Sequence, residues 1–419
     1  AARALQGIGA SLLMPGTLSI LTVTFPIHER ARAIGIWSGV SGLALALGPT
    51  AGGWLVEHAG WQSVFFLNVP IGTIGLIVAS RVVRESKAPE MRKLDLPGLG
   101  LGTAGLFSMT YGLIEANQKG WSSPAIIASL VGAAALLVAF IDWEARNPAP
   151  MLPLRFFRIP AFSAGATVAF SLSLGMFGTF FFMSLYMQLV RGYSAFETGV
   201  RILPITGMIV LVAPNAGKFA QKHGSKIPMV FGLTLAGTGL FLLSRLGATT
   251  PYPWMIPPLM IMGMGMASTM TPMTAAVMNA VGPQRAGLGS ATTNTAREVG
   301  GVFGIALLGT LLTQRLRDSL AAKLVGAGVP PAMREPILAS AGHGRIDPQS
   351  LSGVDPSIAR AVGTAFRSAF LDGFHLALMV ASGILFVAAI VAWRWIPSGA
   401  PGAEASWAPS DSEKALAAV

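Results

Sequence analysis

Ionisable residues inside long apolar segments are the first candidates for chemistry in this chain. Arg297 and Glu298 are adjacent, about ten residues into one such segment. Asp372 begins another segment, and Arg3 lies near the start of a third. An ionisable group is costly in such surroundings and typically faces a cavity, a partner or a proton pathway. A carboxyl group shielded from water can also exchange protons near neutral pH. Arg3, Arg297, Glu298 and Asp372 are therefore candidates for functional charges inside the membrane, and we predict that Glu298 takes part in proton coupling or senses cations.

Each of these residues also has a structural alternative. Arg3 can extend its long side chain to a water surface. Adjacent helical residues point about 100° apart, so Arg297 and Glu298 do not simply neutralise each other, and Glu298 can instead form a salt bridge to a neighbouring helix. Asp372 and His375 share a helix face near one end, where both can simply face water. The sequence leaves these alternatives open.

Methionines are concentrated between residues 255 and 273, at Met255, Met260, Met262, Met264, Met266, Met270 and Met273. Flexible, polarisable side chains of this kind can line a cavity that accepts many ligands. The alternative is that they pack against neighbouring helices or lipid.

A glycine- and proline-rich pattern, Gly39-x8-Gly48-Pro49-x2-Gly52-Gly53, lies inside an apolar segment of helical length. Closely spaced glycines let two helices meet backbone to backbone, and Pro49 removes a helical hydrogen bond. A bilayer tolerates such a break where protein packing compensates for it. Gly48 and Gly52, four residues apart, are predicted to share the contact face.

The elements that must position these residues are membrane helices. Hydrophobic residues make up 53% of the chain and charged residues 11%, and the apolar runs of about 20 residues suffice to cross a ~30 Å hydrocarbon core. Regular alternation in short segments is missing, which argues against a membrane β-barrel. The predicted fold class is all-α, a polytopic membrane protein.

Several kinds of site are not expected. The chain has no cysteine, and its five histidines stand far apart, so no metal site or thiol chemistry is predicted. No P-loop motif and no nucleophile–base set is present, so we expect neither ATP-driven transport nor an enzyme. The net charge of +11 comes from cations in the loops where membrane topology would place them, which argues against nucleic acid as a partner.

Eleven spans are predicted. They cover residues 2–24, 31–55, 62–83, 97–115, 124–143, 161–190, 197–219, 227–246, 253–281, 286–312 and 372–396. One set of loops contains 14 cations: Arg30, Arg32, Arg81, Arg84, Lys87, Arg92, Lys93, Arg146, Arg155, Arg158, Lys218, Lys222, Lys226 and Arg285. The alternate short loops contain 3, namely Lys119, Arg191 and Arg245. The positive-inside rule therefore places the first set and the C-terminus in the cytoplasm.

The segment 313–371 is the one long connection, and it is predicted to be external. Val354, Ile358, Val362 and Phe366 recur there at helical spacing, which indicates either a helix lying on the outer membrane surface or a solvated loop with one helical turn. The tail 397–419 is rich in Ala, Ser, Pro and Gly and is predicted to be disordered.

Several motifs resemble those of the major facilitator superfamily, and in particular its 14-helix drug:proton antiporters. The Gly39–Gly53 pattern resembles the antiporter motif of helix five. Other resemblances follow in family order: Arg3-x2-Gln6-Gly7 (motif B), Trp61-x3-Phe65-Phe66-x-Asn68-x-Pro70, Asp95-x2-Gly98 with Gly120-Trp121 (the two extra helices), Tyr186-x-Gln188-x3-Gly192-Tyr193-Ser194, Gly217-x4-Lys222-x-Gly224-x-Lys226 (a degenerate cytoplasmic loop motif) and Ala296-Arg297-x2-Gly300-Gly301-x2-Gly304.

The resemblance implies a major facilitator fold with 11 of an expected 14 helices, a fragment that lacks helices one to three. Residues 1–83 would then be the remainder of the N-terminal bundle, 84–160 two inserted helices with linkers, and 161–396 the C-terminal bundle. The functional residues that the resemblance implies are the motif B arginine Arg3, the antiporter motif residues Gly39, Gly48, Pro49, Gly52 and Gly53, and the cytoplasmic gate loop residues Gly217, Lys222, Gly224 and Lys226. The charges Arg297, Glu298 and Asp372 are candidates because of their position in apolar segments, not because of the resemblance.

The leading functional hypothesis is proton-coupled efflux of hydrophobic or cationic drugs across the bacterial inner membrane, without a cofactor. The partners would be small amphipathic or cationic substrates and the lipid bilayer, and a periplasmic adaptor is left open. One alternative is a dedicated exporter of one lipid, siderophore or secondary metabolite. Another is a sensor or scaffold that does not transport.

Overall fold

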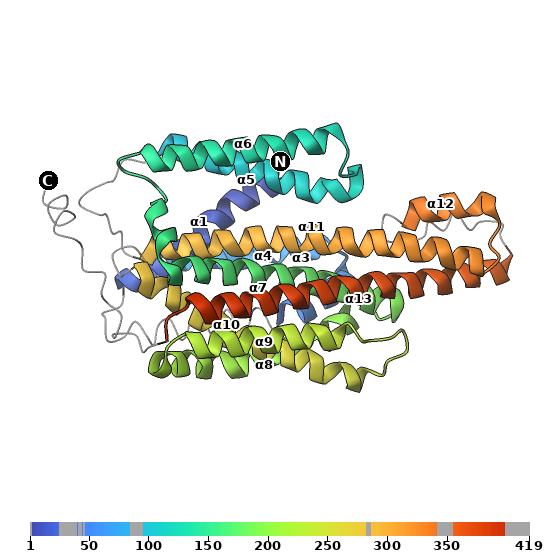
Figure 1. Ribbon diagram of the computed structural model, residues 1–419. Coiled ribbons are helices and arrows are strands. Elements are labelled where there is room, and N and C mark those ends of the chain that lie inside the picture. The colour runs from blue at the N-terminus through green and yellow to red at the C-terminus, as the bar shows by residue number, and fades with distance from the viewer. Residues whose placement is uncertain are drawn as a thin grey trace, which may run out of the picture.

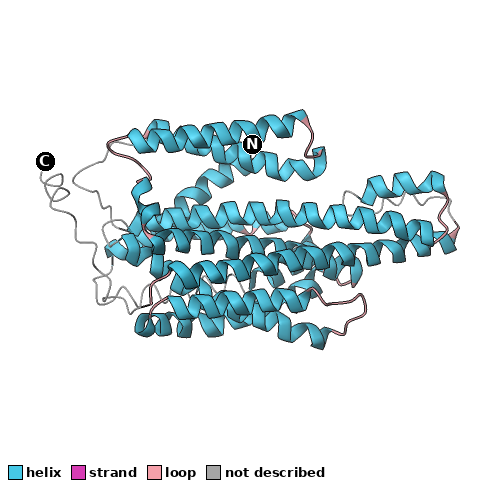
Figure 2. Cartoon of the chain, viewed as in Figure 1, coloured by secondary structure: helices cyan, strands magenta, loops and turns pink. Residues whose placement is uncertain are grey.

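The computed structural model describes residues 2–24, 40, 44, 47–83, 95–281, 286–341 and 355–398 of the 419. Helices connected by short loops account for these ranges, and no strand occurs within them (Figure 2). The all-helical fold class predicted from the sequence is therefore confirmed.

The N-terminal helices are α1 (Ala2–Thr24), a helix over residues 47–59, α3 (Ser63–Phe66), α4 (Asn68–Val82), α5 (Leu96–Lys119) and α6 (Pro124–Arg146). After the short helix η1 (Leu154–Arg158) come α7 (Pro160–Leu185), the π-helix η2 (Tyr186–Val190), α8 (Ala195–His223), α9 (Lys226–Leu243), α10 (Tyr252–Val281), α11 (Ala286–Gly326), α12 (Pro331–Ala341) and α13 (Pro356–Trp395).

A six-helix bundle of α7, α8, α9, α10, α11 and α13 forms the core. One cluster of buried hydrophobic residues joins these helices and extends from Ala164 to Ile396. α7 contacts α10, α11 and α13, and it is apolar on all its faces, as expected of a helix surrounded by others. By contrast, α4 has no buried residue.

Glycines set the closest helix approach in this bundle. A methyl group added to Gly300 or Gly304 of α11 would overlap the carbonyl oxygens of Phe170 and Leu174 of α7. The two glycines are four residues apart and so lie on one face of α11. The Gly300-x3-Gly304 part of the sequence motif is therefore explained by direct backbone packing of α11 on α7.

The helices α5 and α6 form an antiparallel hairpin beside α11 (Figure 1). Ser129 of α6 donates a hydrogen bond of 2.7 Å to the Ser108 carbonyl of α5. Trp121, in the connecting turn, donates a bond of 3.2 Å to the Thr310 hydroxyl of α11.

Two helices are longer than predicted. α11 has 41 residues and α13 has 40, so each is about 60 Å long, roughly twice the thickness of a hydrocarbon core. Both project past the other helices, with α12 near their far end (Figure 1). The stretch with Ile358, Val362 and Phe366 begins α13, so the predictions of a surface-lying helix and of a solvated loop were both wrong there.

The physical reason lies in mutual coverage of two apolar faces. Val362 and Phe366 of α13 are buried in the same cluster as Leu316, Leu320 and Leu324 of α11. Each extension therefore hides its apolar face against the other helix, and neither needs the membrane surface. Val354 and the predicted disordered tail beyond residue 398 lie outside the described residues.

Seven helices in the described ranges are long and apolar enough to cross a membrane: Ser63–Val82, Pro124–Arg146, Pro160–Val190, Ala195–His223, Lys226–Leu243, Gly287–Gly326 and Pro356–Trp395. Most of the predicted span 31–55 is not described, although residues 47–59 are helical. The count of eleven spans stays a prediction.

Candidate functional site

The adjacent residues Arg297 and Glu298 of α11 have different surroundings. Arg297 is partly buried and lines a small cavity with Ser173 and Met176 of α7 and Met273 of α10. Glu298 is exposed, and no ion pair joins it to the part of the chain that the structure describes. The predicted divergence of the two side chains fits this geometry, and a structural salt bridge of Glu298 finds no partner among the described residues.

The methionines of α10 mostly pack inside the bundle. Met255, Met262, Met266 and Met273 are at most 2% exposed, whereas Met260 is 38% exposed. Met262 and Met266 border a second small cavity between α7, α9, α10 and α13. The packing alternative thus accounts for most of this cluster.

The antiporter-motif helix, residues 47–59, meets the first turns of α8 in an interhelical seam formed by Pro49, Gly53 and Glu57 with Ser194, Ala195, Phe196 and Gly199. A methyl group on Gly53 would lie 2.5 Å from the Ala195 carbonyl oxygen, and one on Gly199 would overlap the Pro49 carbonyl oxygen. Pro49 faces Gly199, and Gly53 faces Ala195. The two helices are therefore antiparallel. Backbone-to-backbone packing of this kind requires glycine on both sides.

The contact face differs from the one predicted. Gly48 and Gly52 have no described atom within 4 Å of an added methyl group, whereas Gly53 is buried. Closely spaced glycines could not reveal which face meets the partner, because several of them were available on different sides of the helix. Gly39 and the side chain of Arg3 lie outside the described residues.

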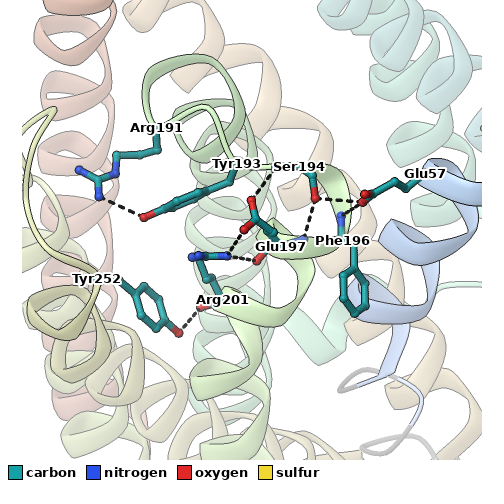
Figure 3. Close-up of polar contacts among 8 residues, drawn as sticks. All are labelled: Glu57, Arg191, Tyr193, Ser194, Phe196, Glu197, Arg201 and Tyr252. Carbon is teal, nitrogen blue, oxygen red and sulfur yellow. Dashed lines mark hydrogen bonds and ion pairs between the residues drawn. The ribbon is translucent and has the colours of Figure 1, made fainter.

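Glu57 lies at the end of the seam where α8 begins, and its carboxylate joins the two helices (Figure 3). Its Oε2 atom accepts a hydrogen bond of 2.9 Å from the Ser194 hydroxyl and one of 3.3 Å from the Phe196 backbone amide. Both donors belong to the N-terminus of α8, where free amides and the helix dipole favour an anion.

Ser194 and Glu197 form a capping box at the same helix end. The Ser194 hydroxyl accepts from the Glu197 amide over 3.2 Å, and Glu197 Oε2 accepts from the Ser194 amide over 3.0 Å. The sequence analysis missed this feature, although the spacing Ser194-x2-Glu197 is a recognised signal for a helix start. No sequence signal pointed to Glu57 as the partner from another helix.

Two arginines surround Tyr193 next to the seam. The Arg201 guanidinium lies 3.8 Å from the Tyr193 ring centre, and Arg191 donates a bond of 3.0 Å to the Tyr193 hydroxyl. Arg201 also pairs with Glu197 at 3.5 Å, and Tyr252 donates a bond of 3.1 Å to the Arg201 carbonyl (Figure 3). This cluster joins α8 to the end of η2 and to the start of α10.

Asp372 has a cationic partner. Lys323 of α11 forms an ion pair with Asp372 Oδ2, which also accepts from the Ser319 hydroxyl over 2.5 Å. His375, one turn later, is bonded through Nε2 to the Leu246 carbonyl over 2.6 Å. The Asp372 side chain is 37% exposed, so it faces water in part, and it also ties α13 to α11.

The predicted gate loop joins α8 to α9. Gly224 ends α8 with a φ of +85°, a left-handed conformation that favours glycine. Lys222 is exposed, and the Lys226 ammonium lies 4.9 Å from the Trp393 ring centre of α13. Gly217 faces Thr271 of α10, since an added methyl group would lie 3.0 Å from the Thr271 methyl.

Asp95 caps α5 and binds the end of α6. Its Oδ1 atom accepts from the Gly98 amide and from Trp143 Nε1, both at 2.9 Å, and its Oδ2 atom accepts from the Asn147 amide at 2.7 Å. These bonds hold the pKa of Asp95 below its ordinary value, and the bond from the Gly98 amide contributes most. The Asp95-x2-Gly98 motif is thus a structural cap.

Within the described ranges, no group of three or more acidic or histidine side chains is arranged to hold a metal ion. The chemistry that the arrangement offers is proton exchange at carboxyl groups and opening or closing of helix contacts.

The chain is similar to several known proteins. Residues 1–305 match the family described as the Major Facilitator Superfamily. The chain is 34% identical over 401 residues to the tetracenomycin C resistance and export protein of Streptomyces glaucescens, covering 93% of this chain and 73% of that protein. It is 31% identical over 401 residues to the multidrug resistance protein Stp of Mycobacterium tuberculosis, covering 94% and 74%. A solved bacterial homologue of the human lysosomal transporter Spinster is similar at 17% identity, with a TM-score of 0.48 over 92% of this chain and 76% of that chain.

Proposed function

This chain belongs to the major facilitator superfamily, and we propose that it exports hydrophobic or cationic small molecules in exchange for protons. Membership makes it a multi-pass membrane transporter and not an enzyme, as the sequence predicted. The export function rests on its similarity to one protein named for tetracenomycin C resistance and export and to another named for multidrug resistance.

One observation supports an alternating-access cycle, namely the interhelical seam. It joins a helix of the N-terminal part to α8 of the C-terminal bundle through backbone contacts at Gly53 and Gly199. In alternating access, two helical bundles rock about a central site. The contacts between the bundles must therefore separate and re-form without interlocking side chains. Glycine-lined contacts meet that need.

The finer architecture is also our proposal. In a 14-helix antiporter the eleven predicted spans would be helices four to fourteen, with residues 1–83, 84–160 and 161–396 as N-terminal bundle, inserted helices and C-terminal bundle. The packing of α5 on α6, and of the six later helices around one core, supports this division. By the positive-inside rule, the loop cations support a topology in which the α8–α9 loop and the C-terminus face the cytoplasm and the seam lies at the outer end.

A proteoliposome assay tests the function. Protein reconstituted with a pH-sensitive dye inside the vesicle should move protons when ethidium is supplied as a cationic probe, and a protonophore should abolish ethidium accumulation. Ethidium movement without proton movement would contradict the coupling mechanism.

A dedicated exporter is the second candidate, because one relative is named for export of a single compound, tetracenomycin C. A resistance panel separates the two candidates. Protection against many unrelated compounds supports polyspecific export, whereas protection against one chemical class supports a dedicated exporter.

A further inference from the structure

The contact of Glu57 with α8 joins two helices that are distant in sequence. Ser194 is 137 residues further along the chain, and its hydroxyl donates to Glu57 Oε2 over 2.9 Å. The second donor, the Phe196 amide, belongs to the backbone at the first turn of α8. Glu57 itself is exposed, so water and protons reach it directly.

The ionised carboxylate is the form that suits this contact. A carboxylate that accepts from a hydroxyl and an amide forms charge-assisted bonds, which are stronger than bonds between neutral groups. Its charge also faces the positive end of the α8 dipole. Protonation removes both advantages and leaves the glycine contacts of Gly53 and Gly199 to hold the seam.

We propose that Glu57 is a positioning residue that holds the outer seam closed while ionised and releases it on protonation. The proposal rests on the proposed function, since it assigns the seam to the outer side of an alternating-access transporter. Glu57 lies outside the antiporter motif. Its protonation by external protons would favour the outward-open state.

Other charged groups near Glu57 have partners of their own. On the same helix, His58 stacks on Trp54 at 4.8 Å between ring centres and is bonded to the Trp54 carbonyl. On α8, Glu197 bonds to Ser194 and pairs with Arg201. These groups supply the controls.

Cysteine accessibility measures the opening of the seam, because the chain has no cysteine of its own. Thr50 lies in the seam, partly buried, with its hydroxyl 3.5 Å from the Gly199 carbonyl. In the protein embedded in membranes, Thr50→Cys is labelled by an impermeant maleimide, and Lys119→Cys on the exposed end of α5 serves as the reference site. The reference site corrects for reagent concentration, and the same pH series in the Glu57→Gln background corrects for the pH dependence of the introduced thiol itself.

Glu57→Gln should raise this ratio about five-fold, because its amide oxygen can still accept from Ser194 and Phe196 but without the assistance of a charge. Ser194→Ala should act similarly, and Glu57→Asp should have a smaller effect. Glu197→Gln is the matched control, since it weakens the same helix cap without touching the helix 47–59, and its ratio should stay within about two-fold.

Acidifying the medium should raise the ratio in the protein that retains Glu57, and also in the His58→Gln and Glu197→Gln variants, but not in Glu57→Gln. An unchanged ratio in Glu57→Gln, or an equal increase in Glu197→Gln, would overturn the proposal. The result does not depend on substrate. Labelling of Lys119→Cys only from the other membrane side would instead contradict the orientation in the proposed function.

Discussion

At the scale of single residues, α11 carries a partly buried and an exposed ionisable side chain at adjacent positions. Arg297 lines an apolar cavity beside methionines, whereas Glu298 stands on the uncovered face of the helix. A carboxyl group in that position can serve a proton-coupled carrier by binding and releasing a proton during the transport cycle.

Glu298→Gln keeps the size of the side chain and removes its titration. We expect export of ethidium to weaken about ten-fold and its pH dependence to flatten, while the amount of folded protein is unchanged. Glu298→Asp should retain part of the activity. The exposed acid Glu335 of α12 supplies the control, as Glu335→Gln should export normally. Unchanged pH dependence in Glu298→Gln would move the coupling role to another residue.

At the scale of elements, the seam between helix 47–59 and α8 predicts different effects on export for substitutions of Gly53 and Gly48. Gly53→Leu should force the two helices apart, because its added atoms meet the Ala195 backbone, at a cost of about 1–3 kcal/mol. Export should fall and proton leak should rise, with expression largely retained. Efflux and leak in vesicles measure both effects.

Gly48→Leu is the matched variant, since no described atom lies near a methyl group at Gly48. It should export close to the normal rate. Equal damage at both positions would mean that the Pro49–Gly53 face is not the decisive contact.

The cap of α5 predicts a pH effect. The pKa of Asp95 is lowered in the folded protein, so its contribution to stability is present above the pKa of the unfolded state and is lost as pH falls through the folded value. Asp95→Ala should lower the thermal midpoint in detergent by about 2 °C at neutral pH and reduce its further fall in acid. A midpoint that declines in acid as steeply as that of the unmodified protein would refute the assignment to Asp95.

At the scale of the whole molecule, loop cations predict a single orientation in the membrane. Lys119 ends α5, whereas Lys222 lies at the end of α8. Cysteine at position 119 should be labelled by an impermeant reagent in intact cells, and cysteine at position 222 only after the membrane is opened. Lys93, outside the described residues, should behave like Lys222. The reverse pattern at 119 and 222 would invert the topology and place the Glu57 contact in the cytoplasm.

The sequence alone determined the class and the family of this protein. Apolar runs of membrane length, and glycine and proline at fixed spacings, are local properties, so they identify membrane helices and family motifs without knowledge of packing. It also identified glycine contacts as important and separated Arg297 from Glu298 by helical geometry.

The tertiary structure decided which of these residues meet. Glu57 and Ser194, or Lys323 and Asp372, are far apart in the chain, and local patterns do not encode such pairs. Gly53 rather than Gly48 faces α8, because the orientation of a helix with glycines on several sides depends on its neighbour. The lengths of α11 and α13 were missed for the same reason: their polar extensions become stable helices only when Val362 and Phe366 cover the leucines of α11.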